Sequence, residues 1–269
     1  MQSGFLQYHS SKIHYRCGGH GPQSLVCFHG YGETGASFDF LENHLSASHK
    51  IIAIDLPFHG STEWKEPLLN ARVLADVIKA LLAHLNTEIK NLQLMGFSMG
   101  GRMALCVLEQ MPAQVSKLVL LAPDGLTVNF WYWLSTQTAP GNSLFKFTMR
   151  KPGWFLGMLR LSNKLRIINQ SIYKFIEYYI HDEAVRKELY ERWTGMSKCT
   201  PSMKRVRSLI SRHQVAVRLL YGKYDRIISH KRGSKLFSDA PNCTVRVLSC
   251  GHQVLHEKNA EAICNALSS

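Results

Sequence analysis

The sequence of 269 residues lacks a long hydrophobic run, and this absence limits the classes of protein that it can encode. No apolar stretch reaches the roughly 18 residues of a membrane-spanning helix, so we expect no stable membrane insertion. The opening residues lack a basic segment followed by an apolar one, so we expect no secretory signal peptide. Glycine and proline, at 19 and 9 residues, are near average, which disfavours extensive disorder.

Paired cysteine motifs are lacking, because the seven cysteines are odd in number and scattered without a Cys-x-x-Cys pair. Cys27 and Cys106 lie inside apolar runs. We therefore expect reduced thiols packed in a core rather than disulfides, which favours a cytoplasmic location. No spacing typical of metal ligands is present, and nothing in the sequence indicates a cofactor.

Acidic residues are few in one third of the chain. The net charge is +13, and residues 125–214 hold 15 Lys or Arg against 5 Asp or Glu, which is +10 of that excess. Such a segment suits a solvated surface or the attraction of an anionic substrate. No nucleic-acid-binding module with interleaved aromatic residues is present, so we expect no nucleic acid partner.

Short apolar runs predict a buried sheet. Two alternating runs, FLQYHS and KIHYRC, predict an antiparallel hairpin near the start of the chain. Continuous apolar runs, typical of parallel strands buried on both faces, follow at residues 24–30, 50–60, 91–98, 115–125, 216–225 and 243–252. Helical spacing occurs at residues 67–85, 99–111 and 257–267. The alternation predicts an α/β fold with a mostly parallel, doubly wound sheet, in which ligands bind beyond the carboxyl ends of the strands.

One long segment departs from this alternation. Residues 126–213, which number 88, contain no clear strand and are aromatic, basic and amphipathic. We interpret them as a helical insertion between two parts of an α/β core, residues 1–125 and 214–269.

The stretch GFSMGG places Ser98 between a predicted strand and a predicted helix. A sharp strand-to-helix turn holds a serine in a strained backbone and projects its Oγ outward. Gly96 and Gly100 fit this turn because a Cβ at either position would collide with the neighbouring strand or helix. The pattern indicates a nucleophile elbow.

A serine nucleophile needs a base, and the base needs a group that orients it. Asp225 and His252 are each the last residue of a predicted strand, on the same edge of the sheet as Ser98, in the chain order Ser–Asp–His. Asp124, at the end of the preceding strand, is the alternative acid, and His256 is the alternative base.

An acyl transfer also needs donors for the developing oxyanion. The backbone N–H of Met99 lies at the start of a predicted helix, where amides are unpaired and the helix dipole is positive. The turn FHGYG provides the second candidate, the N–H of Tyr31, with Gly30 allowing close approach of the backbone.

These motifs resemble the α/β-hydrolase superfamily over nearly the whole chain, in the order HGYG, DLPFHGST, GFSMGG, YGKYD and CGH. The chain departs from the family pattern at Phe58, where glycine is usual. The resemblance implies Ser98 as nucleophile, His252 as base and Asp225 as orienting acid. It also implies that residues 126–213 are a lid domain.

We therefore expect a serine hydrolase that cleaves carboxylic esters or related acyl bonds of a small molecule. The basic lid would favour a substrate that is anionic. Trp131 is a candidate for the pocket wall. A cofactor-free lyase similar to the menaquinone-pathway synthase is an alternative, because Arg102 occupies the place of that family's carboxylate-binding arginine. A non-catalytic receptor is the third reading, disfavoured by a complete triad.

Overall fold

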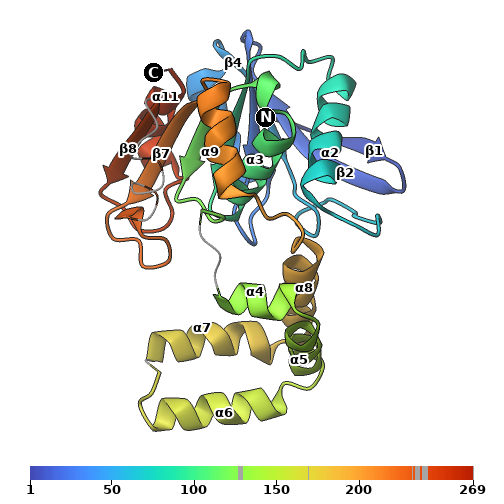
Figure 1. Cartoon of the computed structure of the whole chain (residues 1–269), viewed down its shortest axis with the longest axis vertical. Coiled ribbons are helices and arrows are strands. Elements are labelled where there is room, and N and C mark those ends of the chain that lie inside the picture. Colours follow the sequence, from blue (N-terminus) through green and yellow to red (C-terminus); the bar gives the residue numbers. More distant parts are fainter. Residues whose placement is uncertain (127–129, 169, 232, 234–236, 238–241, 269) are drawn as a thin grey trace. The chain divides into compact units, whose positions relative to one another are not determined.

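The chain forms two compact units in the computed structural model, which describes residues 1–126, 130–168, 170–231, 233, 237 and 242–268. The first unit comprises Met1–Thr127 and Lys198–Ser269, and the second comprises Val128–Ser197. Figure 1 shows the helices and strands of both units, with labels on many of them. Within the predicted insertion, residues 127–129 and 169 lie outside the described residues.

The first unit is built on an eight-stranded sheet with the order β1-β2-β4-β3-β5-β6-β7-β8. Strand β1 pairs antiparallel with β2 and β2 antiparallel with β4, whereas all other neighbours pair parallel. The strands are β1 (Gln2–Tyr8), β2 (Ser11–Gly18), β3 (Gln23–Phe28), β4 (His49–Ile54), β5 (Leu92–Phe97), β6 (Val115–Leu121), β7 (Ala216–Gly222) and β8 (Cys243–Leu248). The predicted mostly parallel α/β sheet and its hairpin are confirmed.

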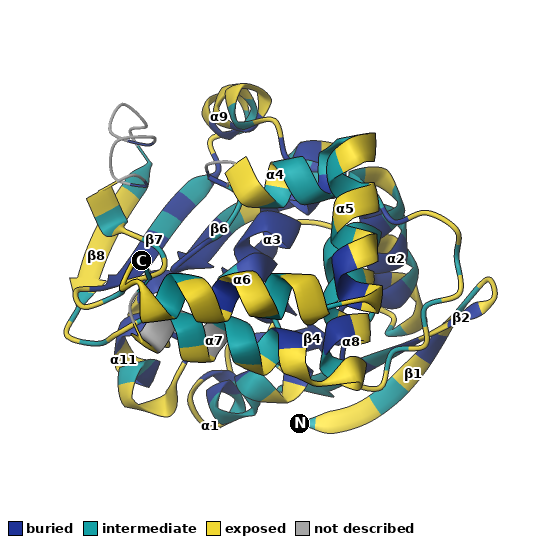
Figure 2. Ribbon diagram, turned by 90° about the horizontal axis from the view of Figure 1, so that it is seen from below, coloured by how far each residue is buried: buried dark blue, intermediate teal, exposed yellow. Residues whose placement is uncertain are grey.

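Burial of the strands follows from their apolar patterns. All six residues of β5 are buried, because helices cover both faces of the central sheet, whereas β1 and β2 alternate between covered and exposed positions. Figure 2 shows the central strands and α3 in the colour of buried residues. Strands β7 and β8 end at Gly222 and Leu248, earlier than predicted, so Asp225 and His252 lie in the loops that follow them.

Helices pack on both faces of this sheet. One face is covered by a core cluster that includes residues of η1 (Gly35–Leu41), α1 (Glu42–Leu45) and α11 (Ala260–Ser268). Helix α3 (Met99–Gln110) packs against β3, β5 and β6 and is flanked by α2 (Ala71–His84) and α9 (Met203–Arg212). The unit also contains the short 3-10 helices η2 (Pro112–Gln114) and η3 (Glu257–Asn259).

The predicted helix start at Pro67 is wrong by four residues. Helix α2 begins at Ala71 because the side chain of Asn70 accepts a hydrogen bond of 2.9 Å from the backbone N–H of Val73 and caps the helix. Leu68, predicted on the apolar face of the helix, lies before it and is 49% exposed.

The second unit is helical. Its elements are α4 (Phe130–Gln137), α5 (Ala139–Arg150), α6 (Gly153–Lys164), α7 (Gln170–His181) and α8 (Glu183–Gly195). The buried guanidinium of Arg186 joins three of them, since it donates hydrogen bonds to the carbonyl oxygens of Met149, Ile180 and His181. This unit ends at Ser197, so the predicted insertion runs past it: α9 belongs to the first unit and contacts α3. Among the helices that the structure describes, none is long and apolar enough to cross a bilayer.

Candidate active site

Ser98 occupies a strained turn between β5 and α3. Its φ of 49° and ψ of −116° lie in a region that residues with a Cβ rarely adopt. The backbone N–H of Ser98 donates to the carbonyl oxygen of Leu121 (2.9 Å), and the carbonyl oxygen of Ser98 accepts from Gly101 (2.9 Å) and Asp124 (2.8 Å). These three bonds tie the turn to β6 and α3 and stabilise the strained conformation.

The flanking glycines are needed for packing around this turn. A Cβ on Gly96 would lie 2.3 Å from the carbonyl oxygen of Gly100, and a Cβ on Gly100 would lie 1.9 Å from that of Phe28. Both distances are far below van der Waals contact with rigid backbone. The predicted reason for the G-x-S-x-G spacing therefore matches the contacts in the structure.

Three side chains from distant parts of the first unit form one hydrogen-bonded row. The Nε2 of His252 lies 3.0 Å from the Oγ of Ser98, and its Nδ1 lies 2.8 Å from the Oδ2 of Asp225. The Oδ1 of Asp225 accepts hydrogen bonds from the backbone N–H groups of Ile227 (2.7 Å) and Ile228 (2.9 Å). The buried carboxylate is thus held in place on both oxygens, with one directed at the imidazole.

The alternative acid and base have other partners. The Oδ2 of Asp124 lies 3.5 Å from the Nε of Arg102, and the Nδ1 of His256 accepts a hydrogen bond of 3.1 Å from the backbone N–H of Lys258 at the start of η3. The structure therefore brings Asp225 and His252, rather than these two residues, to Ser98.

The side chain of His29 holds the turn after β3 in place. The buried ring of His29 contacts the carbonyl oxygen of Gly30 through Nδ1 (2.7 Å) and accepts a hydrogen bond from the backbone N–H of Leu56 at Nε2 (3.0 Å). Because Nε2 is an acceptor, the ring proton lies on Nδ1. Tyr31 follows in this turn, and Met99 is the first residue of α3 directly after Ser98.

Sequence reasoning missed Glu33, which connects this turn to the loop of His252. One carboxylate oxygen accepts a hydrogen bond from the backbone N–H of Gly30 (3.2 Å), and the other accepts from the side-chain amide of Gln253 (3.0 Å). In the sequence, Glu33 is recognisable only as a carboxylate three residues after the His-Gly pair. Nothing there indicates that it bonds to Gln253.

Comparison with known proteins gives the family. A family model described as the alpha/beta hydrolase fold matches residues 23–259. The chain belongs to this family. It is 27% identical over 246 residues to the uncharacterized hydrolase YugF of Bacillus subtilis, covering 88% of this chain and 86% of that protein. It is 25% identical over 264 residues to the human monoacylglycerol lipase ABHD6, covering 93% of this chain and 77% of the lipase.

A solved structure supports the same fold. The thermophilic esterase of Thermogutta terrifontis aligns with a TM-score of 0.71 and 16% identity, covering 100% of this chain and 98% of the esterase. At 16% identity, this likeness shows only that the two chains share a fold.

Two further predicted site residues have different surroundings. Arg102 lies on α3 with its side chain only 8% exposed, beside Asp124 and in close contact with the backbone position of Gly125. Trp131 lies on α4 of the second unit, where it is 70% exposed and packs edge-on against Phe130. Its place in a pocket wall stays a prediction.

A second Ser–His–Asp row lies elsewhere in the same unit. The Oγ of Ser3 lies 2.7 Å from the Nε2 of His14, whose Nδ1 lies 2.8 Å from the Oδ2 of Asp55. Ser3 lies within the edge strand β1, so no helix begins after it. Asp55 also accepts hydrogen bonds from the backbone N–H groups of Gly35 (2.7 Å) and Ser61 (2.9 Å), which indicates a structural role. Substitution of Ser3 in this row is therefore a matched control for substitution of Ser98.

The thiols are poor candidates for nucleophiles. All seven cysteines are free, and burial raises the pKa of Cys199 to about 12 and that of Cys243 to about 11. A thiol is nucleophilic as the thiolate, so these two are inert at neutral pH. In the part of the chain that the structure describes, no group of three His, Cys, Asp or Glu residues is arranged to hold a metal ion.

Proposed function

We propose that the chain is a serine hydrolase that cleaves a carboxylic ester, or a related acyl bond, through a covalent intermediate on Ser98. The observation that supports this proposal most strongly is the row from Ser98 through His252 to Asp225, with contacts of 3.0 and 2.8 Å. Family membership agrees with it, and the name of the human relative specifies a lipase of monoacylglycerol, which is a carboxylic ester.

In the first step, His252 removes the hydroxyl proton through Nε2 while the Oγ of Ser98 attacks the substrate carbonyl. The imidazolium that forms is stabilised by the carboxylate of Asp225 at Nδ1. Because two backbone N–H groups fix that carboxylate, the ring is already oriented before substrate binds.

The tetrahedral oxyanion accepts hydrogen bonds from the backbone N–H groups of Tyr31 and Met99. The Met99 amide lies in the first turn of α3, where the helix dipole is positive. Loss of one such donor typically costs about 3 to 4 kcal/mol of transition-state stabilisation. Gly30 sits between His29 and Tyr31, and its bond to Glu33 fixes the direction of this turn.

The intermediate then collapses in two stages. The C–O bond to the leaving alcohol breaks as His252 returns the proton to that oxygen, leaving an acyl group on Ser98. Water, deprotonated by His252, attacks the acyl carbonyl, and the acid departs with regeneration of the serine hydroxyl. No cofactor takes part in either stage.

We assign the second unit the role of a lid that selects the acyl chain and leaving group, with Trp131 as part of the pocket wall. This role rests on the position of the unit in the chain, between β6 and β7. The exposed apolar side chains of the unit and its exposed Lys and Arg residues suit an amphipathic or anionic substrate.

The lyase is the weaker proposal. It requires Arg102 to bind a substrate carboxylate, but that side chain is nearly buried and lies beside the carboxylate of Asp124. Arg102→Ala, assayed with a neutral ester and with an anionic substrate, separates the two. A selective loss on the anionic substrate supports the lyase-type role, and an equal effect on both contradicts it.

Hydrolysis of short p-nitrophenyl esters tests the proposed function. Ser98→Ala is expected to reduce turnover by about 10⁶-fold, whereas the matched control Ser3→Ala leaves it within about two-fold. Substantial turnover by Ser98→Ala would refute the assigned nucleophile. An inactive wild type on esters, thioesters and amides alike would favour a receptor.

A further inference from the structure

Helix α6 carries apolar side chains on two faces, of which only one packs within the second unit. Leu159 is buried, and α6 packs against α7. On the other face, the exposed fractions are 44% for Trp154, 48% for Met158, 56% for Leu161 and 59% for Leu165. At about 100° per residue these four positions fall within about 60° of one another, in a stripe roughly 16 Å long.

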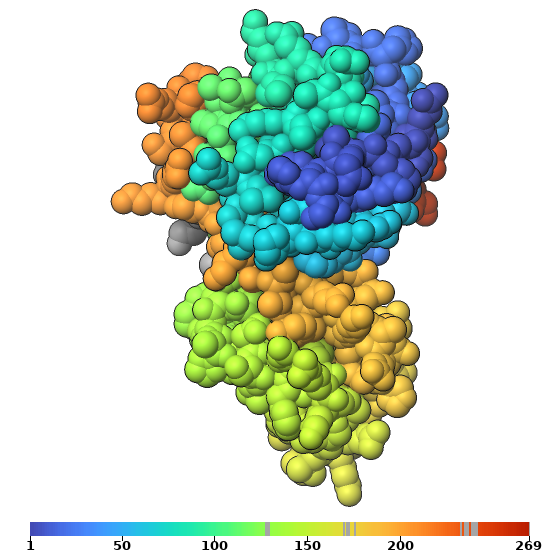
Figure 3. Space-filling view, turned by 90° about the vertical axis from the view of Figure 1, so that its right-hand side faces the viewer, coloured from blue at the N-terminus to red at the C-terminus, as the bar shows by residue number. Residues whose placement is uncertain are grey.

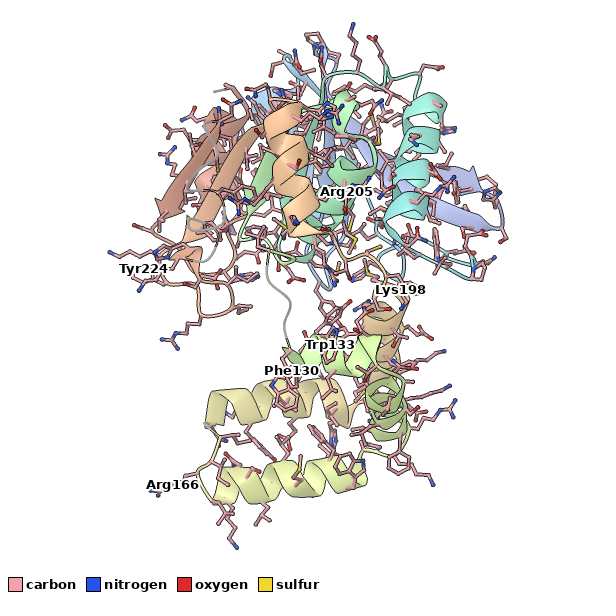
Figure 4. The ribbon with its side chains drawn as sticks, viewed as in Figure 1. Phe130, Trp133, Arg166, Lys198, Arg205 and Tyr224 are labelled. Carbon is pink, nitrogen blue, oxygen red and sulfur yellow. The ribbon has the colours of Figure 1, made fainter. Side chains whose placement is uncertain are left out.

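The stripe continues into the turn after the helix. Ile167 is also exposed, next to Arg166, whose side chain points outward from the turn between α6 and α7 in Figure 4. Exposed Lys164 lies at the end of the helix and exposed Lys151 directly before it. The α6 surface comprises Lys151, Trp154, Met158, Leu161, Lys164, Leu165, Arg166 and Ile167.

No acidic residue accompanies these cations in the sequence. Residues 125–176 contain seven Lys or Arg and no Asp or Glu, and the next acidic residue is Glu177 on α7. The acidic Glu188 and Glu191 of α8 already pair with Arg192 and Lys187. The segment appears as the yellow-green surface of the second unit in Figure 3, and Figure 2 shows exposed residues recurring along α6.

We propose that the α6 surface docks on a lipid bilayer that contains anionic lipids. An amphipathic helix with an apolar stripe and flanking cations lies in the plane of the interface, with apolar side chains in the acyl boundary and cations at the phosphates. Trp154 suits this boundary because its ring is apolar and its N–H is polar. This inference does not depend on the proposed ester chemistry.

The composition of the surface disfavours two other occupants. Single-stranded nucleic acid is bound by aromatic stacking between cations, but three of the four residues of the α6 stripe, Met158, Leu161 and Leu165, are aliphatic. In a two-fold symmetric dimer, the same patch would meet itself, so the cations at both ends of α6 would face like charges. An anionic membrane complements both the charge and the apolar stripe.

Co-sedimentation of the full chain with sucrose-loaded vesicles tests this proposal. We expect the chain to sediment with vesicles of phosphatidylcholine mixed with phosphatidylglycerol, to remain in solution with phosphatidylcholine alone, and to be released by salt, which screens the cations. Lys151→Gln, Lys164→Gln and Arg166→Gln together should lower partitioning by about 100-fold. Leu161→Gln should lower it by roughly 10-fold.

Matched substitutions in the first unit test whether vesicle binding depends on the α6 surface itself or on the overall charge and hydrophobicity of the chain. Leu68→Gln removes a leucine that is exposed to a similar degree, and the combination of Lys90→Gln, Lys204→Gln and Arg212→Gln removes three exposed cations. Both controls should keep wild-type partitioning. Circular dichroism checks that every variant keeps its helical content.

Three results would overturn the proposal. The first is a wild type that does not sediment with the anionic vesicles. The second is a first-unit control that lowers partitioning as much as the α6 variants. The third is a Leu161→Gln variant that keeps full partitioning but changes the molecular mass or thermal stability of the chain, which would show that a second copy or the first unit covers the stripe.

Discussion

The carboxylate of Glu33 accepts a hydrogen bond of 3.0 Å from the side-chain amide of Gln253, the residue directly after His252. Its other oxygen holds the backbone N–H of Gly30 at 3.2 Å. One side chain therefore connects the turn of the proposed oxyanion donor with the loop of the proposed base. Since misplacement of such groups by about 1 Å can cost 100-fold in rate, we infer that this bridge positions the two groups for catalysis.

We predict that Glu33→Ala lowers kcat by about 10- to 100-fold with little change in KM, because donors and base lose their shared anchor. Glu33→Gln keeps the length of the side chain but has one acceptor oxygen for two N–H donors, so its kcat should lie between those of Glu33→Ala and the wild type. Steady-state kinetics on a p-nitrophenyl ester measures both values. Glu63→Ala is the control, because Glu63 is exposed and its carboxylate forms a surface ion pair with Lys65 (3.3 Å). An unchanged kcat in Glu33→Ala, or an equal loss in Glu63→Ala, would contradict a positioning role.

A second prediction concerns the acid. Asp225→Asn should reduce kcat by about 10⁴-fold while the fold is retained, because an amide neither fixes the productive tautomer of His252 nor stabilises its imidazolium. Asp124→Asn changes the alternative carboxylate, which lies beside Arg102, and should leave kcat within a few-fold of the wild type. If Asp124→Asn proved the more damaging of the two, the acid would be wrongly assigned.

The backbone of Ser98 gives a prediction about stability. Both Ser98→Ala and Ser98→Gly remove the hydroxyl, but only glycine relieves the strain at φ 49°. We expect Ser98→Gly to be more stable than Ser98→Ala by about 1 kcal/mol, a rise in Tm of roughly 2 to 4 °C. Differential scanning calorimetry of the two inactive variants makes the comparison. Equal melting temperatures would mean that the turn stores no strain at this residue.

Much of the first unit could be predicted from sequence because its central strands are continuous apolar runs bounded by glycine or helix signals. Residues 91–98 illustrate this, because the buried strand must end at the glycines around Ser98. At Gly96 and Gly100 the neighbouring backbone lies so close that no Cβ fits. Chain order then limited the acid and base to loops at one edge of the sheet. The row of Ser98, His252 and Asp225 follows from that topology.

The remaining features depend on contacts between residues that are distant in the sequence. Glu33 and Gln253 are 220 residues apart, and no local pattern pairs them. The row of Ser3, His14 and Asp55 arises from strand register, in which Leu6 faces Ile13 and Tyr15 faces Ile54. The limits of the helical insertion were missed because α9 is amphipathic like the helices of the second unit, and only its packing on α3 assigns it to the first.

The most direct test of the central claim is to find the residue that a fluorophosphonate modifies. Its phosphorus forms a bond with an activated serine oxygen as fluoride leaves, and trypsin then releases Ser98 in the peptide of residues 91–102 and Ser3 in that of residues 1–12. Our account predicts one phosphonate on the 91–102 peptide in the wild type, and none on it in His252→Gln over the same labelling time. A phosphonate on the 1–12 peptide with residues 91–102 unmodified would contradict it.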